Sequence, residues 1–596
     1  PNKPKNLDSF LFPGLHHLAA LQKEGLRVWD ASKSKVVSDH PFLAYKLADT
    51  PAMTQLTGRV GHHGALGCRF YCLLKGRHKQ GGSQYYPACL KPLNYTVPNS
   101  CHPDVVLRDF KETPDQVHER YKQSLQFVTQ SKNQAEYRRR HLTTGICKPT
   151  IFSGLSPSHQ LTIPGCFPTD LMHLASLNLT DLLLGLWRGV IDCDPKDSRA
   201  TWDWMVLHGE TWTTHGALVG AAMSYLPGSF DRPPRNLADK INSGYKAWEF
   251  LTYVFGYCPA MLYGILPTKY WKNFCKLVLG VRLLHQHRLS CLELGVAHKA
   301  LIEFCEEFEH IYYQRRPERL HFCRQSVHQM RHAIPESKKT GLLPLTTQWA
   351  MEHVIGDLGQ EIKQPSNPFA NLSQRGLRRA RVNALKAMMP DLEPEKSIYP
   401  RGSMPLDGGY VLLCAKDSAS RAVLPVEGKA ILDYLEETGG QEGLDNNGES
   451  QVVVRWARLR LPNTQIARSA WKEKLKPISQ VCMARNVKMK LDADWHFGEV
   501  QYYFCLHIDQ KTVPLAMVSM YGPPDADLLK LSSQTVWSCQ YQGQSAMKVV
   551  HVNTIQSVVA MVPHQSRQEW TNRYFVVEKM GLEIAYKGMG EAMVDE

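Results

Sequence analysis

Apolar residues recur at helical spacing through much of the first 360 residues. The clearest segments are LHHLAALQKEGLRVWD, DLMHLASLNLTDLLLGLW and HKALIEFCEEFEHIYYQRR. Thr169 or Asp170 stands where the N-cap of the second segment is expected. A further helix is predicted for TTQWAMEHVIGDLGQEIK, with Trp349, Val354 and Ile355 among the residues of its buried face.

Alternation of apolar and polar residues predicts strands in two places. PFLAYKLADT is typical of a strand that ends at Asp49, because Pro51 stops it. After about residue 451 the alternation recurs in QVVVRWARLRL, GEVQYYFCLHI, VPLAMVSMYG, MKVVHVNTI and SVVAMVP. These short strands predict a small antiparallel β barrel or sandwich at the C-terminal end of the chain.

The composition is that of a basic, multidomain protein. The chain has 596 residues, of which 43% are hydrophobic, and its formal charge is +14. This excess favours polyanionic partners, nucleic acid first, although a merely basic soluble protein is the alternative. No apolar run reaches about eighteen residues, so no membrane span is predicted. PNKPKNLDSF is not a signal peptide, so the sixteen Cys residues are expected to be reduced thiols and metal ligands.

Two pairs of metal-ligating residues lie far apart in the sequence. Cys68 and Cys72, in GCRFYC, fall within the Cys spacing of structural zinc sites. His328 and His332, in SVHQMRH, are four residues apart and would share one face of a helix. Each pair is a weak signal alone, and the alternative is buried thiols with a surface His pair. Three further histidines near the Cys pair compete as ligands: His62, His63 and His78.

Two acids stand at similar distances from these pairs. Asp49 precedes Cys68 by nineteen residues, and Glu352 follows His332 by twenty. Converging carboxylates hold the divalent ions that activate water or a 3′-hydroxyl in phosphodiester cleavage and strand transfer. Mg²⁺, or Mn²⁺, suits such oxygen ligands. A lone Asp or Glu is more often a helix cap or a solvated charge.

Together these motifs resemble those of the CACTA (En/Spm-like) DDE transposases, in the form abundant in fungal genomes. The resemblance covers roughly residues 1–390 and is carried by KPKNLDSFLFPGLHHLAALQKEGLRVWDA, ADTPAMTQLTGRVGHHGALGCRFYC, TDLMHLASLN and TQWAMEHVIGDL. It implies an RNase H-like core whose Asp-Asp-Glu triad binds two metal ions, with a helical insertion before the Glu. Asp49 then matches the second Asp and Glu352 the Glu. The Cys and His pairs match structural zinc ligands shared with the Transib transposases and the V(D)J recombinase.

The sequence departs from this family in two ways. The family's Cys pair is usually CxxC, whereas Cys68 and Cys72 form CxxxC. The first catalytic Asp would lie on the first strand of the core, upstream of the residue at which this sequence starts. Asp8 and Asp30 are the nearest acids, but they match non-catalytic positions. We therefore expect an incomplete RNase H-like core, lacking its first strand.

Other residues are candidates for contacts to DNA or to the core. Four Arg and one Lys after the catalytic helix could follow a phosphate backbone, although a solvated helix face explains them equally well: Arg375, Arg378, Arg379, Arg381 and Lys386. Asp170 and His173 belong to the family's DLMH motif. An N-cap followed by a buried His is the simpler interpretation, and a supporting contact to the core or to DNA is the alternative.

The predicted fold class is α/β plus all-β, in four parts. Residues 1–102 hold the first part of the core with the Cys half-site, and 103–325 form a mainly helical insertion. Residues 326–395 hold the His half-site, the catalytic Glu helix and the basic segment. Residues 396–596 form the β-rich domain, with an acidic, Gly-rich loop near 435–450.

The predicted function is that of a DNA transposase, truncated, that works in the nucleus. It would cleave double-stranded DNA at the transposon ends and join these ends to target DNA. Catalysis would use Mg²⁺ or Mn²⁺, and a Zn²⁺ ion would have a structural role. The resemblance implies a homodimer, and the C-terminal β domain is a candidate for chromatin or protein contacts. The alternative is a catalytically dead, domesticated or degenerate derivative that only binds DNA or chromatin.

Overall fold

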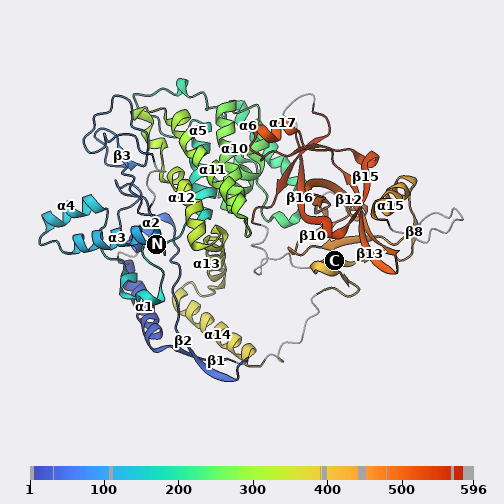
Figure 1. The fold of residues 1–596 in the computed structure, drawn as a ribbon, viewed down its shortest axis with the longest axis horizontal. Helices are drawn as coiled ribbons and strands as arrows, with labels where there is room; N and C mark the ends of the chain where they lie inside the picture. Colours follow the sequence, from blue (N-terminus) through green and yellow to red (C-terminus); the bar gives the residue numbers. More distant parts are fainter. Residues whose placement is uncertain are drawn as a thin grey trace. The chain divides into compact units, whose positions relative to one another are not determined.

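The computed structural model (Figure 1) is a mixed α/β protein with a helical region and a large antiparallel sheet. It describes residues 6–30, 32–106, 112–389, 391, 399–439, 452–477, 480–564 and 570–581. The chain divides into two compact units. Unit 1 comprises residues 1–208 and 267–348, and unit 2 comprises residues 209–266 and 349–596. Part of the helical region thus belongs to the same unit as the C-terminal sheet.

Unit 1 is mainly helical. Its α-helices are α1 (Leu7–Glu24), α2 (Thr50–Thr57), α3 (Pro114–Thr129), α4 (Gln134–Thr144), α5 (Thr180–Trp187), α10 (Thr268–Leu284), α11 (Cys291–Phe308) and α12 (Gln325–Thr340). Two short antiparallel ribbons accompany them, formed by β1 (Leu26–Asp30) with β2 (Lys35–Asp39) and by β3 (Arg77–His78) with β4 (Tyr85–Tyr86). The predicted apolar side of α11 is confirmed, since Leu301, Phe304 and Phe308 are buried.

The segment before Asp49 is not the strand that the sequence predicts. Only Leu43 makes a β-bridge, with Gln160, through backbone bonds to residues 159 and 161. The rest of the segment runs as irregular chain to α2, where the Asp49 carboxylate accepts a hydrogen bond from the Ala52 amide at 2.9 Å. The apolar alternation was misleading because a strand also needs a neighbouring strand to pair with, and here the pairing stops after one residue.

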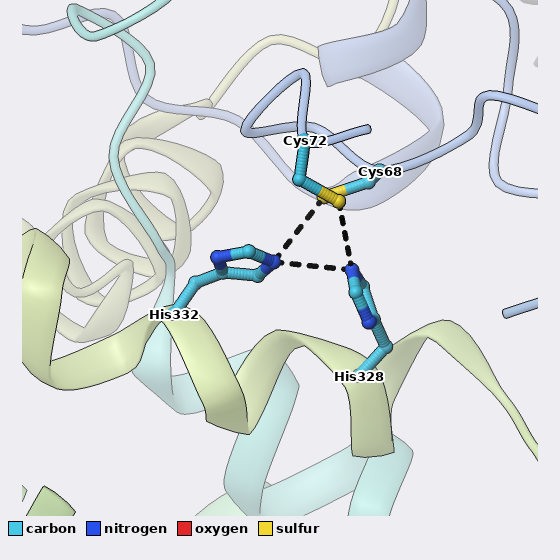
Figure 2. Close-up of side chains that lie close together, drawn as sticks. All are labelled: Cys68, Cys72, His328 and His332. Atoms are coloured by element: carbon cyan, nitrogen blue, oxygen red, sulfur yellow. Dashed lines mark hydrogen bonds between the residues drawn. The ribbon is translucent and has the colours of Figure 1, made fainter. Parts of the chain in front are cut away.

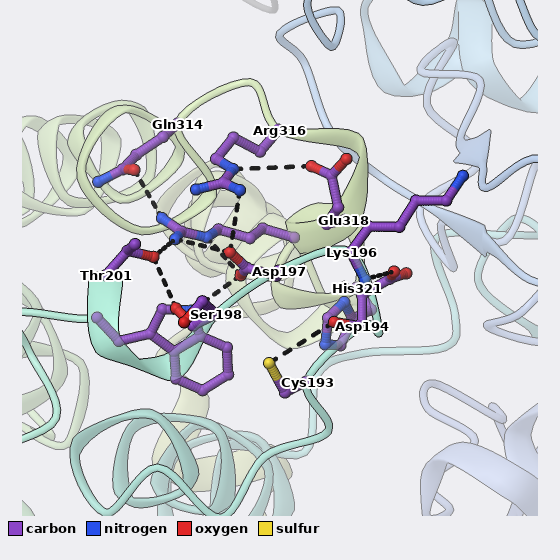
Figure 3. A network of polar contacts seen from close by, with 12 residues as sticks. Cys193, Asp194, Lys196, Asp197, Ser198, Thr201, Gln314, Arg316, Glu318 and His321 are labelled. Carbon is purple, nitrogen blue, oxygen red and sulfur yellow. Dashed lines mark hydrogen bonds and ion pairs between the residues drawn. The ribbon is translucent and has the colours of Figure 1, made fainter.

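A buried ion pair holds the middle of unit 1 together (Figure 3). Asp197 accepts two hydrogen bonds from Arg319, at 2.7 and 3.0 Å, and both side chains are almost fully buried. Gln314 and Thr201 accept the remaining contacts of the guanidinium, at 2.6 Å each. This network joins two segments 122 residues apart and satisfies the charge of each partner in the interior.

Unit 2 is built around an antiparallel sheet of eleven strands, larger than the sequence predicts. Its strands are β5 (Met404–Pro405), β6 (Val411–Lys416), β9 (Trp456–Arg460), β10 (Ile466–Arg468), β11 (Asn486–Leu491), β12 (Asp494–Ile508), β13 (Lys511–Met520), β14 (Ser538–Gln540), β15 (Met547–His551), β16 (Ile555–Pro563) and β17 (Arg573–Glu578). A separate ribbon pairs β7 (Arg421–Ala422) with β8 (Val452–Val453). Strands β12, β13, β15 and β16 follow the predicted alternating segments.

Both faces of this sheet are covered, which explains why the successive β12 residues Tyr502, Tyr503 and Phe504 are all buried. Tyr503 packs into one apolar cluster with residues of β9, β11 and β16. Tyr502 and Phe504 point to the other cluster, which includes residues of α15 (Pro425–Thr438). Residues 435–438 of the predicted acidic loop therefore end a helix, and residues 440–450 lie outside the described residues.

Besides α15, the α-helices of unit 2 are α6 (Gly209–Ala221), α7 (Leu237–Lys240), α8 (Ala247–Leu251), α9 (Cys258–Met261), α13 (Trp349–Glu361), α14 (Pro368–Met388), α16 (Ala470–Glu473) and α17 (Ala526–Leu531). Two of them, α13 and α14, bury no residue. The expected buried face of α13 is therefore wrong, since Val354 and Ile355 are 45% and 56% exposed. Among the described residues, no helix has the length and apolar character needed to cross a bilayer.

Candidate metal centre

Helix α12 supplies the two histidines. His328 and His332 are one helical turn apart, so both rings project from the same face, as the sequence predicts. Their Nε2 atoms lie 3.1 Å apart. His328 is buried, and the ring of His332 packs against Phe70 with a centroid separation of 4.6 Å. The histidines thus face the loop that carries the cysteines.

The two cysteines lie on an irregular loop that is held by one arginine. The Arg59 guanidinium donates to the carbonyl oxygens of Arg69 at 2.9 Å and Cys68 at 2.8 Å. Just before Cys68, the chain passes so close to itself that a Cβ at Gly67 would lie 2.8 Å from the Gly61 carbonyl oxygen. Glycine is therefore required where the loop folds back to present the Cys pair.

The four side chains converge on one point (Figure 2). Cys68 Sγ lies 3.6 Å from His332 Nε2, and Cys72 Sγ lies 3.4 Å from His328 Nε2. All four ligand atoms are within 4.8 Å of one another. In a tetrahedral zinc site, bonds of about 2.3 Å to sulfur and about 2.0 Å to nitrogen place S and N ligands roughly 3.5 Å apart. The donor set and its separations therefore fit a metal ion such as zinc, and the CxxxC spacing does not prevent it.

The protonation chemistry of the cluster suits metal binding. Burial raises the pKa of Cys68, but its hydrogen bond with Cys72 and the nearby His332 and His328 outweigh burial and hold that pKa well below the usual value. Burial lowers the pKa of His328, which favours the neutral imidazole that ligates metals. The hydrogen bond with Cys68, together with burial, raises the pKa of Cys72 well above its usual value. Before any ion binds, the site therefore favours a thiolate at Cys68, a thiol at Cys72 and a neutral His328 ring.

A second set of contacts fixes α12 against the rest of unit 1. Glu336, one turn after His332, accepts hydrogen bonds from the Thr169 amide at 2.7 Å and from Arg69 at 3.0 Å. On the same helix Arg331 lies 3.8 Å from the Glu309 carboxylate. Such contacts orient a ligand-bearing helix in much the same way as the outer contacts of known metal sites orient their ligands.

The competing histidines lie outside this cluster. His62 and His63 pack against each other with ring centroids 3.8 Å apart, and His78 contacts the Lys79 carbonyl oxygen through Nδ1. Among the described residues, the His, Cys, Asp and Glu side chains whose ligand atoms lie close enough together to share one metal ion are Cys68, Cys72, His328 and His332.

The two predicted catalytic acids are placed differently. Asp49 caps α2 in unit 1, and Glu352 is exposed on α13 in unit 2. Neither belongs to a group of metal-ligating residues among those described. The structure gives no support to a magnesium site, which stays a prediction.

Asp170 and His173 form a pair at the start of a helical segment. The Asp170 carboxylate accepts the Met172 amide at 3.1 Å and the Gln348 amide at 3.0 Å, and it also contacts Nδ1 of His173. The predicted capping role of Asp170 is thus confirmed. The predicted basic residues all lie on α14, where Arg375 and Arg379 pair with Glu361.

Sequence reasoning missed the residues that support the cluster. Arg77 is fully buried and donates five hydrogen bonds to backbone carbonyls of residues 88, 89, 100, 102 and 103. It therefore holds the Gly-rich segment after Cys72 without any metal. The available signals were weak. Glu336 follows His332 by four residues, and Arg59 and Arg69 lie in the same motif as the Cys pair.

In comparisons with protein-family models, curated proteins and solved structures, no match to this chain was found.

Proposed function

We propose that this chain acts on DNA as a CACTA-like DDE transposase, with a structural zinc ion in the Cys and His cluster. Asp49 and Glu352 would be two of its catalytic carboxylates, within an RNase H-like core, and the protein would work in the nucleus on transposon ends. Divalent ions such as Mg²⁺ supply the charge stabilisation and activated nucleophile that phosphodiester cleavage needs.

One observation supports this proposal above the others. Ligands from two segments about 260 residues apart meet with zinc-like geometry. Of these ligands, Cys68 stands nineteen residues after Asp49 and His332 stands twenty before Glu352. A chance CxxxC and a chance HxxxH would have no reason to meet, so the convergence favours the shared pattern over its separate parts.

Metal analysis tests the first half of the proposal. The purified chain should contain one zinc ion per chain, and Cys68→Ser combined with His332→Ala should lose it. Cys101→Ser is the matched control, because Cys101 is exposed and outside the cluster. Full zinc content in the double variant would rule out these ligands.

DNA cleavage tests the second half. Asp49→Asn keeps an N-cap acceptor while removing the charge, so it separates catalysis from helix stability. In a version of the chain extended upstream to supply the first Asp, nicking of duplex DNA in Mg²⁺ should fall to background in Asp49→Asn and in Glu352→Gln. Asp357→Asn, on the same exposed helix as Glu352, should cut like the parent chain. Cleavage that survives both substitutions would exclude these two acids.

Two features favour a second function, namely DNA binding without cleavage: the capping role of Asp49 and the exposure of the basic helix α14. The Asp49 carboxylate is engaged in capping α2, whereas the basic helix α14 is exposed along its length. A protein that binds DNA or chromatin without cutting it would have these properties. It would show salt-sensitive, sequence-indifferent affinity for DNA and no nicking in Mg²⁺.

A further inference from the structure

Three arginines share one face of the sheet in unit 2. Leu459 of β9 is buried in an apolar cluster on one side of the sheet, so its neighbours in the strand, Arg458 and Arg460, point to the other side. The register of β10 on β9 places Arg468 directly opposite Arg458. All three arginines are partly exposed. Neighbouring strands thus bring three cations together, and we call them the arginine face.

Apolar residues lie between these arginines and the sheet. Leu413 of β6 pairs with Arg458, and Val411 and Ile466 flank Arg460 on its two sides. The three apolar residues are buried together in one cluster. Arginine covers such a surface with its aliphatic stem and keeps its charged end in water, which accounts for the partial exposure of the arginine face.

The guanidinium groups of the arginine face keep unused donors at the surface. Arg458 donates to the Cys414 carbonyl at 2.6 Å. Arg460 lies over the Tyr399 ring, 5.6 Å from its centroid, so that contact engages the flat side of the guanidinium and not its N–H edge. The side-chain nitrogens of Arg460 and Arg468 make no hydrogen bond to a described residue, and none of them is buried.

None of the three arginines forms an ion pair with a residue that the structure describes. Glu473 lies within electrostatic range of Arg468, but its carboxylate is already paired with Arg485 at 3.3 Å. Two other arginines of the same unit have carboxylate partners, since Arg455 pairs with Asp417 at 2.8 Å and Arg485 also pairs with Glu499 at 2.7 Å. The arginine face therefore lacks the counter-ions that these two have.

The register makes this lack of counter-ions costly. Opposite charges at directly facing positions stabilise an antiparallel pair, whereas like charges destabilise it. Arg458 and Arg468 are such a like-charged pair. An anion that contacts both guanidinium groups would remove the repulsion, so the pair is better explained by a ligand than by the stability of the sheet.

We propose that the arginine face binds the phosphate backbone of DNA. The planar guanidinium group matches the geometry of phosphate oxygens, and contacts of this kind position a protein on DNA without reading its sequence. The face lies on β9 and β10, so it is a different surface from the basic residues of α14. The choice of DNA as the polyanion rests on the proposed function.

Fluorescence anisotropy of a labelled DNA duplex, titrated with the full chain in zinc and without Mg²⁺ over a series of NaCl concentrations, tests the surface. The arginine triple variant combines Arg458→Gln, Arg460→Gln and Arg468→Gln. Its plot of log affinity against log salt should be shallower than that of the parent chain by about 2 to 3, because each phosphate contact contributes roughly 0.9 to the slope. Its affinity at low salt should fall by at least about tenfold.

A lysine triple variant is the matched control, because it removes the same charge from other strands of the sheet. It combines Lys488→Gln, Lys511→Gln and Lys548→Gln, and two of these lysines are already paired with Glu578 and Glu437. Its salt slope should stay within about 1 of the parent value. Equal salt slopes in the two triple variants would overturn the proposal.

Arg468→Glu separates lost binding from a damaged fold. It places a carboxylate directly opposite Arg458, so the two side chains should form a cross-strand ion pair. The melting temperature should equal or exceed that of the parent chain, while DNA affinity falls. Unchanged DNA affinity would overturn the proposal. A melting temperature well below that of the parent chain would also overturn it, because Arg458 and Arg468 would then not be an uncompensated pair.

Two further measurements separate this proposal from its alternatives. Glu352→Gln should bind DNA like the parent chain, so a failure of the cleavage assays leaves the binding test intact. If poly-glutamate binds the parent chain but not the arginine triple variant, while both bind DNA equally, the surface is one for an acidic protein segment and the proposal is wrong. Absence of DNA binding by the parent chain would overturn it as well.

Discussion

Helices α12 and α13 are close in the sequence and similar in length, yet α12 is largely buried and α13 is not. Of the sixteen residues of α12, nine are buried, including His328, Arg331 and Glu336. Of the thirteen residues of α13, none is buried. The sequence alone predicts a helix for each, from the spacing of His328 and His332 in α12 and from apolar spacing in α13. Their difference shows that apolar spacing predicts a helix, whereas polar contacts to distant segments decide whether the helix is held in place.

The largest expected effect comes from removing the metal. Chelation of zinc, or the Cys68→Ser and His332→Ala pair, should destabilise unit 1, because zinc binding to small Cys and His sites supplies on the order of 10 kcal/mol. Hydrogen exchange should then rise sharply along α12 and stay unchanged along α13. Cys291→Ser, at an exposed cysteine, is the control. Equal protection of α12 with and without chelator would show that the metal does not hold it.

The next largest effect should come from Glu336. Glu336→Ala leaves Arg69 buried without its carboxylate partner, and breaking such a pair costs about 3–5 kcal/mol. The free energy of unfolding, measured in urea with zinc in excess, should fall by that amount. Glu352→Ala on α13 is the matched change. A similar loss in both variants would remove the contrast between the helices.

The metal centre and the Asp197–Arg319 ion pair of Figure 3 should be lost at different pH values as the solution is acidified. Protons compete with zinc for thiolate and imidazole ligands, so zinc should be released between about pH 6 and pH 4. Burial opposes ionisation of Asp197, but its bonds from Arg319 and Trp202 lower its pKa to about 2, below the ordinary 3.8. A lowered folded pKa means that this pair stabilises the fold above pH 3.8, and that its contribution is lost as the pH falls towards 2. Two acid transitions are expected in a fluorescence titration, and Asp197→Asn should abolish the lower one only.

The smallest effect is expected on α13. Glu352→Ala and Ile355→Ser alter exposed side chains, so each should change the free energy of unfolding by no more than about 0.5 kcal/mol. If Ile355→Ser instead destabilised the protein by more than about 1 kcal/mol, α13 would be covered in solution and its exposure here would not describe it.

Several elements could be predicted from local sequence. The spacing of Leu301, Phe304 and Phe308 placed one face of α11, and the alternation in GEVQYYFCLHI placed β12. Asp170 was predicted as a cap because capping depends only on the next two or three residues. The strand before Asp49 could not be predicted correctly, because strand formation depends on a partner that the local sequence does not contain.

The candidate metal centre likewise has features that the local sequence indicates and features that only the tertiary structure shows. The sequence offered two weak pairs of ligands, with His62, His63 and His78 as competitors, and only the resemblance to a family joined the two pairs into one set. Only the tertiary structure could show that Cys68 and Cys72 meet His328 and His332, and that Arg59 and Glu336 hold them there. The Cys–His contacts and the Glu336–Thr169 contact join segments 167 to 264 residues apart. The free energy of such contacts comes from burial and from hydrogen bonding to distant partners, which no local pattern records.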